Sequence, residues 1–407
     1  MEKIRIENLS LIFGKHKNRA LKLLNSGKDK AAILEETGCN VAVSNANLSI
    51  REGEIFVIMG LSGSGKSTLL RCVNRLINPT AGKIFLNNKE ITNMSDKELL
   101  EIRRSELAMV FQHFGLLPHR TVLSNVAFGL ELRGIKQQDR EKKAMEVIEL
   151  VDLAGYENQK VSELSGGMQQ RVGLARGLAN SPEVLLMDEA FSALDPLIRS
   201  QMQDELLLLQ EKMQKTILFI THDLEEAIKL GDRIAIMKDG EIVQVGTAEE
   251  IITKPENDYV KSFVEKVDHS TIITAASIMF KKPTLARLKD GPRTVLRMMR
   301  ETGLKVLPVV RTNRTFLGHI RINDVVRIID EKLTSIESGI DKNTMTVTPD
   351  TTVEDMLPLI TKTNYPIPVI NEVGHLLGLV SLTSLIAETT GKDREEIKDI
   401  IQKAIEL

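Results

Sequence analysis

The feature that most constrains the fold is a glycine-rich loop at Gly60–Thr68. It has the spacing G-x4-G-K-S, follows the β-branched apolar run Ile55–Met59 and precedes a predicted helix, which is the context of a phosphate-binding loop. Glycines let backbone N–H groups turn inward around an anion, and the helix N-terminus adds its dipole. Lys66 can reach the β- and γ-phosphates, and the Ser67 hydroxyl can hold Mg²⁺. The sequence therefore predicts a nucleotide site in an α/β domain.

The overall composition is that of an ordinary globular protein. The 407 residues are 42% hydrophobic and 27% charged, which suits two or three domains. The net charge of -2 gives no argument for a nucleic-acid partner, and Cys39 and Cys72 lack the spacing of a disulfide frame or a zinc site. No apolar run reaches the ~18 residues that span a bilayer, and the N-terminus lacks a signal-peptide core. We therefore expect a cytoplasmic protein that reaches a membrane only through a partner.

A later apolar run ends on two carboxylates. Val184–Met187 predicts a buried strand, and Asp188 and Glu189 follow it directly. The carboxyl ends of strands are common ligand sites in α/β sheets. ATP hydrolysis needs a metal ligand and a group that orients water. We expect Asp188 to hold the metal and Glu189 to polarise the attacking water.

Two further apolar runs also end on polar side chains. His222 follows Thr216–Ile220, where it could contact a γ-phosphate. Gln112 follows Leu107–Phe111 and could reach the metal or water through its amide. Asp195 comes shortly after the carboxylate pair, where the Asp-Pro dipeptide indicates a helix start.

A second glycine-containing loop, Leu164–Gly167, opens a predicted helix and is a second potential anion site. It comes 98 residues after Lys66 (164 minus 66), so spacing does not show that both loops touch one nucleotide. Near the N-terminus, residues 2–13 alternate and predict an edge strand. Phe13 could stack on an adenine ring or pack in the core, and the pattern alone favours the core. Residues 15–42 then predict two short amphipathic helices.

The chain after about residue 267 repeats at an offset of 60 residues. Leu307–Val310 matches Ile367–Ile370, and each copy reads helix, strand, turn, strand, helix. Two small α/β units with incomplete cores should pack on each other.

The two copies differ in charge. Residues 273–332 hold 13 Lys or Arg against 5 Asp or Glu, whereas residues 333–391 hold 2 against 7. The positive charge of the first copy indicates an anionic partner. Alternatively, its basic residues form a solvated helix face, or the basic copy packs against the acidic one.

These motifs together resemble the ATP-binding subunits of ABC transporters. The matching motifs, in the family's order, are the Walker A loop Gly60–Thr68, the Q-loop Gln112, the signature Leu164–Gln170, the Walker B run Val184–Glu189, the D-loop Ser192–Asp195 and the switch His222. The resemblance implies a head-to-tail dimer in which the signature loop of one copy closes on the ATP held by the other. It also places Phe13 where the family has its adenine-stacking aromatic, which reverses the preference for the core.

The resemblance implies a set of site residues. Glu189, His222 and Gln112 are the expected catalytic residues, and Ser67, Gln112 and Asp188 are the expected metal ligands. The expected nucleotide contacts are Phe13, Gly60, Leu61, Ser62, Gly63, Ser64, Gly65, Lys66, Ser67, Thr68, Ser165, Gly166, Gly167, Gln169 and Asp195.

Longer stretches look like the glycine betaine/proline betaine importer ATPases. These are Glu54–Thr68, Met187–Arg199, Gly231–Thr247 and the 15–42 insertion. The resemblance implies import of a compatible solute in osmotic stress, with a membrane permease subunit and a substrate-binding protein or domain, on the cytoplasmic side of the cell membrane. Choline, carnitine or proline stay open as solutes. A soluble ABC ATPase of DNA repair or translation is a second hypothesis, and a non-catalytic nucleotide-binding regulator is a third.

The expected architecture is an ABC-type P-loop domain with a β-rich edge sheet and a helical subdomain, followed by a tandem pair of CBS modules. The ABC domain covers residues 1–267, with its signature subdomain at about 95–180. The CBS modules cover 273–332 and 333–391, and a C-terminal helix covers 392–407. A CBS pair implies regulation by an adenine nucleotide, a cyclic dinucleotide, or ionic strength sensed at an anionic membrane surface. Asp324 and Ser384 stand where many such modules hold a ribose.

Overall fold

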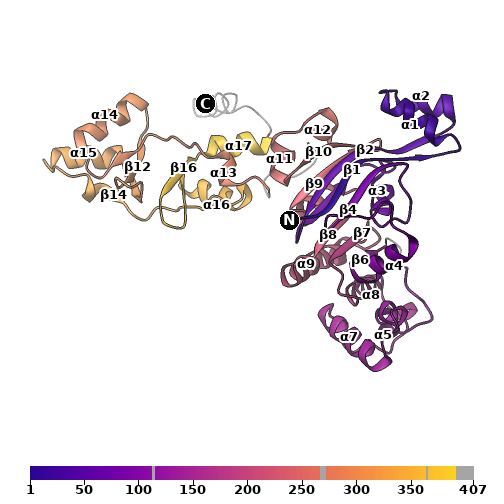
Figure 1. Cartoon of the computed structure of the whole chain (residues 1–407). Helices are drawn as coiled ribbons and strands as arrows, with labels where there is room; N and C mark the ends of the chain where they lie inside the picture. The colour runs from indigo at the N-terminus through magenta and orange to yellow at the C-terminus, as the bar shows by residue number, and fades with distance from the viewer. Residues whose placement is uncertain (112–114, 266–271, 364, 391–407) are drawn as a thin grey trace. The chain divides into compact units, whose positions relative to one another are not determined.

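The computed structural model describes residues 1–111, 115–265, 272–363 and 365–390 (Figure 1). The chain forms two compact units, Met1–Val267 and Asp268–Leu407. Within the described ranges, no helix combines the length and the apolar character that crossing a membrane requires. Gln112 and the predicted helix at 392–407 lie outside the described residues.

The first unit is built on a six-stranded sheet with the order β10-β9-β3-β8-β7-β6. The five strands from β9 to β6 run parallel, and β10 is antiparallel to β9. β3, β7 and β8 are buried along their whole length, as strands of a parallel sheet covered on both faces are. The strands are β3 (Ile55–Met59), β6 (Leu107–Val110), β7 (Val184–Asp188), β8 (Thr216–Thr221), β9 (Arg233–Lys238) and β10 (Glu241–Gly246).

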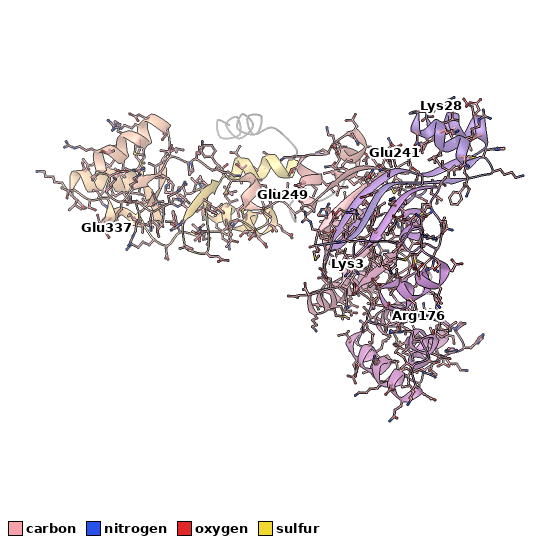
Figure 2. All side chains as sticks on the ribbon, in the orientation of Figure 1. Lys3, Lys28, Arg176, Glu241, Glu249 and Glu337 are labelled. Carbon is pink, nitrogen blue, oxygen red and sulfur yellow. The ribbon has the colours of Figure 1, made fainter. Side chains whose placement is uncertain are left out.

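A second, antiparallel sheet has the order β2-β1-β4-β5. The prediction of an edge strand at residues 2–13 is wrong, because β1 pairs with β2 on one side and β4 on the other. Alternation reports a buried face and says nothing about how many neighbours a strand has. Lys3 of β1 donates to Glu183, just before β7, at 2.6 Å (Figure 2 labels Lys3). The strands are β1 (Glu2–Phe13), β2 (Asn40–Arg51), β4 (Ala81–Leu86) and β5 (Lys89–Glu90).

Two helices, α1 (Lys17–Asn25) and α2 (Lys30–Thr37), connect β1 to β2. The Asp29 side chain caps α2 by accepting from the Ala31 N–H, and Gly38 ends the helix in the left-handed region at φ 64°. A small apolar cluster fixes both helices to the strands, because Ile12, Ala20, Ile33, Cys39 and Val41 are buried together. The segment is therefore a packed element of the first unit.

The remaining helices of the first unit cover the large sheet or form a helical layer beside it (Figure 1). Ser95 and Glu98 form a complete capping box at the start of α4. The helices are α3 (Lys66–Val73), α4 (Asp96–Ser105), α5 (Val122–Val126), α6 (Phe128–Leu132), α7 (Gln137–Leu150), η1 (Val161–Glu163), α8 (Gly166–Leu178), α9 (Pro196–Met213), α10 (Leu224–Leu230), α11 (Ala248–Thr253) and α12 (Asp258–Val264).

The second unit contains the helix–strand–strand–helix order twice, as α14-β12-β13-α15 and α16-β15-β16-α17. The tips of the two hairpins are joined by backbone hydrogen bonds from Phe316 N to Gly374 O and from Leu376 N to Arg314 O, both at 3.0 Å. The elements are α13 (Ala275–Ile278), β11 (Ala286–Arg287), α14 (Pro292–Thr302), β12 (Val306–Val310), β13 (Phe316–Arg321), α15 (Ile322–Asp330), η3 (Glu337–Gly339), β14 (Ile340–Asp341), α16 (Val353–Thr363), β15 (Ile367–Ile370), β16 (Leu376–Val380) and α17 (Leu382–Thr390).

Candidate functional site

The glycine-rich loop connects β3 to α3 at the carboxyl edge of the large sheet. Two of its glycines have backbone neighbours too close for a side chain, since a Cβ at Gly60 would lie 2.1 Å from the Met237 carbonyl oxygen and one at Gly65 would lie 2.5 Å from that of Ala42. The loop borders a cavity of about 560 Å³. Of the predicted loop contacts, Ser62, Gly63, Gly65, Lys66, Ser67 and Thr68 line this cavity, and Gly60, Leu61 and Ser64 do not.

Lys66 is held in place by the loop itself. Its ammonium donates to the carbonyl oxygens of Gly60 at 2.8 Å and Leu61 at 3.0 Å, and the residue is only 4% exposed. Burial lowers the pKa of Lys66, while the charges of Glu189 and Asp188 raise it. The loop thus presents a fixed cation beside backbone N–H groups, which suits a polyphosphate.

Ser67 and Asp188 meet beneath the loop. The Ser67 hydroxyl donates to Asp188 Oδ1 at 2.6 Å, and Arg71 Nη2 lies 3.5 Å from Asp188 Oδ2. Mg²⁺ in nucleotide sites takes few protein oxygen ligands and completes its shell with phosphate oxygens and water. The hydroxyl and carboxylate oxygens of this pair fit that donor set.

Glu189 and His222 come together from neighbouring strands. Glu189 follows β7 and His222 follows β8, and His222 Nδ1 lies 3.3 Å from Glu189 Oε2. Glu189 has a backbone φ of 46°, and its N–H donates to the Ile220 carbonyl at 3.1 Å. Glu189 also lines the cavity of the glycine-rich loop, so a carboxylate faces the space where the last phosphate would lie.

The second glycine loop lies at the start of α8. The Ser165 hydroxyl caps this helix by accepting from Met168 N at 3.4 Å, and the Gln169 amide donates to Leu164 O at 3.0 Å. Asp195 caps α9 by accepting from Ile198 N at 3.0 Å. The described residues that line the cavity of the glycine-rich loop include none of the predicted nucleotide contacts in these two segments, namely Ser165, Gly166, Gly167, Gln169 and Asp195. Within one chain, the signature loop therefore does not contribute to the cavity of the glycine-rich loop.

Phe13 ends β1 and lines the cavity with 40–42 at the start of β2. It is 43% exposed, so its ring is open to a ligand. Sequence reasoning missed the lining residues that come from the start of α2 and from the turn between β9 and β10, namely Asp29, Lys30, Asp239 and Gly240. No local pattern in the sequence places this turn or α2 against the glycine-rich loop.

The second unit has a smaller cleft of about 210 Å³ where its two modules meet. Arg321 Nη2 pairs with Asp341 Oδ2 at 2.9 Å, and the Arg321 guanidinium lies 5.4 Å from the centre of the Tyr365 ring. Burial lowers the pKa of His319, which also lines the cleft, to about 4. Asp324 and Ser384, the predicted ribose positions, do not line it; they contact Arg327 and Ser381 instead.

Comparisons with known proteins agree with this geometry. A family model described as ABC transporter matches residues 43–192, and one described as CBS domain matches 275–331 and 336–390. The chain is 51% identical to the glycine betaine/carnitine transport ATP-binding protein GbuA of Listeria monocytogenes, over 97% of this chain and 99% of that one.

The chain belongs to the ATP-binding subunits of ABC transporters. It is also 49% identical to the glycine betaine transport ATP-binding protein OpuAA of Bacillus subtilis, over 96% of this chain and 93% of that one. The ProV protein of Escherichia coli, a glycine betaine/proline betaine transport ATP-binding protein, is 45% identical over 98% of this chain and 99% of that one. The predicted fold class and family are confirmed, and this ABC ATPase is an ATP-hydrolysing enzyme coupled to transport.

A solved structure matches 60% of this ABC ATPase. It is described as the dimeric structure of a post-hydrolysis state of the ATP-binding cassette MJ0796 bound to ADP and Pi. The TM-score is 0.51 at 34% identity, covering 60% of this chain and 98% of that one.

Proposed function

We propose that this ABC ATPase powers the uptake of glycine betaine or a related compatible solute in osmotic stress. The observation that carries the proposal is that relatives named for glycine betaine transport match nearly the whole chain at 45–51% identity. Relatives named for choline alone and for carnitine alone match at 36% and 38%, whereas GbuA at 51% is named for both glycine betaine and carnitine. Sequence identity therefore favours glycine betaine over choline, and choline, carnitine and proline are the alternative solutes.

Two copies of the chain would act together on a membrane permease at the cytoplasmic side of the cell membrane. The separation of the signature loop from the cavity of the glycine-rich loop supports a head-to-tail pair, in which Ser165–Gly167 of one copy closes the cavity of the other. The matching cassette MJ0796 is itself described as dimeric, which agrees with this arrangement. A substrate-binding protein or domain would deliver the solute to the permease.

The cavity residues divide the work of hydrolysis. Lys66 and the loop N–H groups would bind the β- and γ-phosphates, and Phe13 would stack on adenine. Ser67 and Asp188 would hold Mg²⁺, which neutralises phosphate charge when bound. Glu189 would accept the proton of the attacking water, and His222, within 3.3 Å of that carboxylate, would contact the γ-phosphate.

The CBS pair would gate this motor. Its cleft of about 210 Å³ is smaller than the ~300 Å³ from which ligand pockets usually begin. A cleft of this size is small for an adenine nucleotide or a cyclic dinucleotide. The geometry therefore favours ionic strength as the signal, because half-exposed ion pairs weaken as salt screens them. An anionic membrane surface is a fitting partner for the basic first module.

The test is solute-stimulated ATP hydrolysis by the chain assembled with its permease and binding protein in lipid vesicles. We expect glycine betaine to stimulate hydrolysis more than choline, carnitine or proline at equal concentration. Stimulation by one of those solutes alone would reassign the substrate. A chain that stays unstimulated by all of them and purifies without a permease would overturn the proposal.

A further inference from the structure

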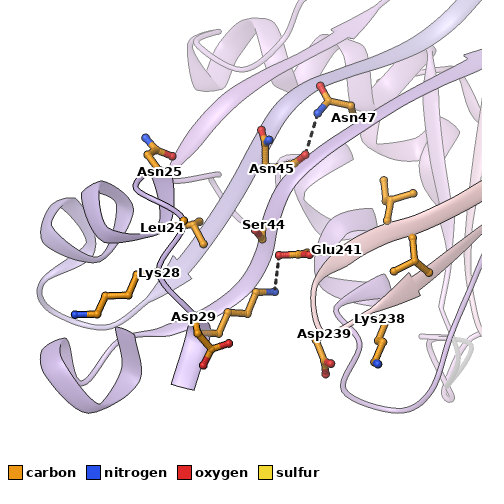
Figure 3. A pocket seen from close by; sticks show the side chains of 14 residues that line it. Leu24, Asn25, Lys28, Asp29, Ser44, Asn45, Asn47, Lys238, Asp239 and Glu241 are labelled. Atoms are coloured by element: carbon orange, nitrogen blue, oxygen red, sulfur yellow. Dashed lines mark hydrogen bonds and ion pairs between the residues drawn. The ribbon is translucent and has the colours of Figure 1, made fainter. Parts of the chain in front are cut away.

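The segment between β1 and β2 supplies part of the wall of the ATP cavity. Asp29 and Lys30, at the start of α2, line the same cavity as Phe13 and Lys66. Lys30 also lines an adjoining groove of about 1000 Å³. In Figure 3 this groove separates Asp29, on the inserted segment, from Asp239 and Glu241, on the β9–β10 hairpin. None of the ABC motifs includes these residues of the insertion.

The Lys30 ammonium has no hydrogen-bond partner among the residues that the structure describes, although the atom is buried. Lys30 Nζ forms an ion pair with Glu241, whose Oε1 lies 4.0 Å away. The Lys30 side chain as a whole is 22% exposed. Burial lowers the pKa of Lys30, while Glu241, Asp239 and Asp29 raise it. A buried ammonium without an acceptor is unfavourable, so its position needs a further explanation.

The ammonium lies against a turn that is bonded to the glycine-rich loop. A Cβ at Gly240 would lie 2.8 Å from Lys30 Nζ and 2.6 Å from the Ala42 carbonyl oxygen. The Gly240 N–H donates to Ser64 O, and the Ser44 N–H donates to Gly240 O, each at 2.8 Å. Lys30 is therefore next to the residues that shape the phosphate-binding backbone.

The backbone position of Lys30 is fixed by the packing and capping of α2. Ile33, one turn along α2, is fully buried in the cluster that anchors the insertion to the strands, and Asp29 caps the helix. The neighbouring Lys28 offers a contrast, because its ammonium is already paired with Glu36. Of these two lysines, Lys30 is the one that lines the ATP cavity.

We propose that Lys30 is a nucleotide-binding residue. When ATP binds, its ammonium turns from the buried position beside Gly240 into the cavity and donates to oxygen atoms of the ribose–phosphate part, between Phe13 at the adenine and Lys66 at the terminal phosphates. This rests on the placement of ATP proposed above. An ammonium has three donors and no acceptor, so oxygen-rich groups are the partners that satisfy it. The inserted helices thus complete the nucleotide site of this chain.

The test compares Lys30→Met with Lys28→Met in the full chain, with the dissociation constant of MgATP measured by titration calorimetry. Loss of a hydrogen bond to a charged partner weakens binding about tenfold or more, so Lys30→Met should do so and Lys28→Met should not. Lys30→Arg should restore most of the affinity. Adenosine separates the two oxygen sources: its affinity falls in Lys30→Met if the ribose hydroxyls are the acceptors and stays unchanged if the phosphates are.

Lys66→Ala separates this inference from the placement of ATP. If Lys66→Ala weakens MgATP binding but a folded Lys30→Met binds as the wild type does, Lys30 is not a nucleotide contact. If neither variant weakens binding, ATP lies elsewhere and both proposals fail. Should Lys30→Met unfold, as thermal unfolding would reveal, Lys30→Gln takes its place with the same expectation.

Discussion

Single residues at the carboxyl edge of the large sheet show how the fold prepares the chemistry. Glu189 sits in the left-handed backbone region at φ 46°, which costs a residue with a side chain about 1 kcal/mol or more. The bond from its N–H to Ile220 O, and the contact with His222, hold it there. This strained backbone conformation places Glu189 in the lining of the cavity.

We expect Glu189→Gln to bind MgATP with unchanged affinity and to hydrolyse it about a hundredfold more slowly or worse, because an amide cannot accept the proton of water. The measurement pairs ATP titration with phosphate release from the assembled transporter. Glu225→Gln, an exposed glutamate at the start of α10, serves as the control and should hydrolyse normally. Undiminished hydrolysis in Glu189→Gln would remove Glu189 from the mechanism.

His319 gives a prediction for pH. The folded second unit depresses the pKa of His319 to about 4 by burial, below the ~6.5 of an unfolded chain. Between pH 6.5 and pH 4 the unfolded chain therefore binds a proton at His319 that the folded unit does not bind. The free energy of unfolding of the second unit should fall over this range by up to about 3 kcal/mol. Calorimetric unfolding at pH 7 and pH 5 should show the loss in the wild type and less of it in His319→Gln. Equal pH dependence in the two proteins would contradict this assignment.

Among the secondary-structure elements, the β9–β10 turn connects the insertion to the glycine-rich loop. Gly240 has a φ of +78°, and a Cβ there would collide with Ala42 O and Lys30 Nζ. Gly27 is a matched control, because its φ is +79° and a Cβ there would meet nothing within 4 Å. Both alanine substitutions share the backbone penalty, and only Gly240→Ala adds a clash.

We expect Gly240→Ala to lower the free energy of unfolding by about 1–3 kcal/mol more than Gly27→Ala does. Chemical denaturation of the full chain measures this difference. The same Gly240 variant should bind MgATP more weakly, since the turn is bonded to Ser64 in the loop. Equal losses in the free energy of unfolding would show that the β9–β10 turn accommodates the added Cβ without a further loss of stability.

Local patterns were enough to predict some of these elements but not their neighbours. The strand, loop and helix around Lys66 follow from residues close in sequence, as does the capping box at Ser95. The second partner of β1 could not be predicted, because pairing with β4 depends on contacts far along the chain. The approach of Lys30 to Gly240 and the Arg321–Asp341 pair in the CBS cleft are likewise contacts between distant segments.

For the whole molecule, the proposed mechanism requires two chains that share each ATP. Lys66→Ala removes the ammonium that would bind the phosphates, and Gly166→Asp places a carboxylate at the signature loop. A Cβ at Gly166 would meet only Leu194 at 3.9 Å, so the second variant should fold. A dimer formed from one chain of each kind has one composite site with both halves intact.

We therefore expect each variant alone to be inactive and a mixture of the two to regain part of the ATP hydrolysis. The two folded variants are mixed, left to exchange subunits and assayed by phosphate release. Mixing wild-type chain with Lys66→Ala controls for the rate of exchange. A mixture that stays as inactive as its components, despite exchange, would show that each site is built within one chain.

The proposed function is tested by ATP-driven uptake of labelled glycine betaine into vesicles that contain this chain, its permease and its binding protein, with salt and cyclic dinucleotide varied separately. We expect uptake that needs ATP on the side of the membrane where this chain lies, rises with salt on that side, and vanishes with Glu189→Gln. Betaine uptake that continues unchanged without ATP, or with Glu189→Gln, would contradict it.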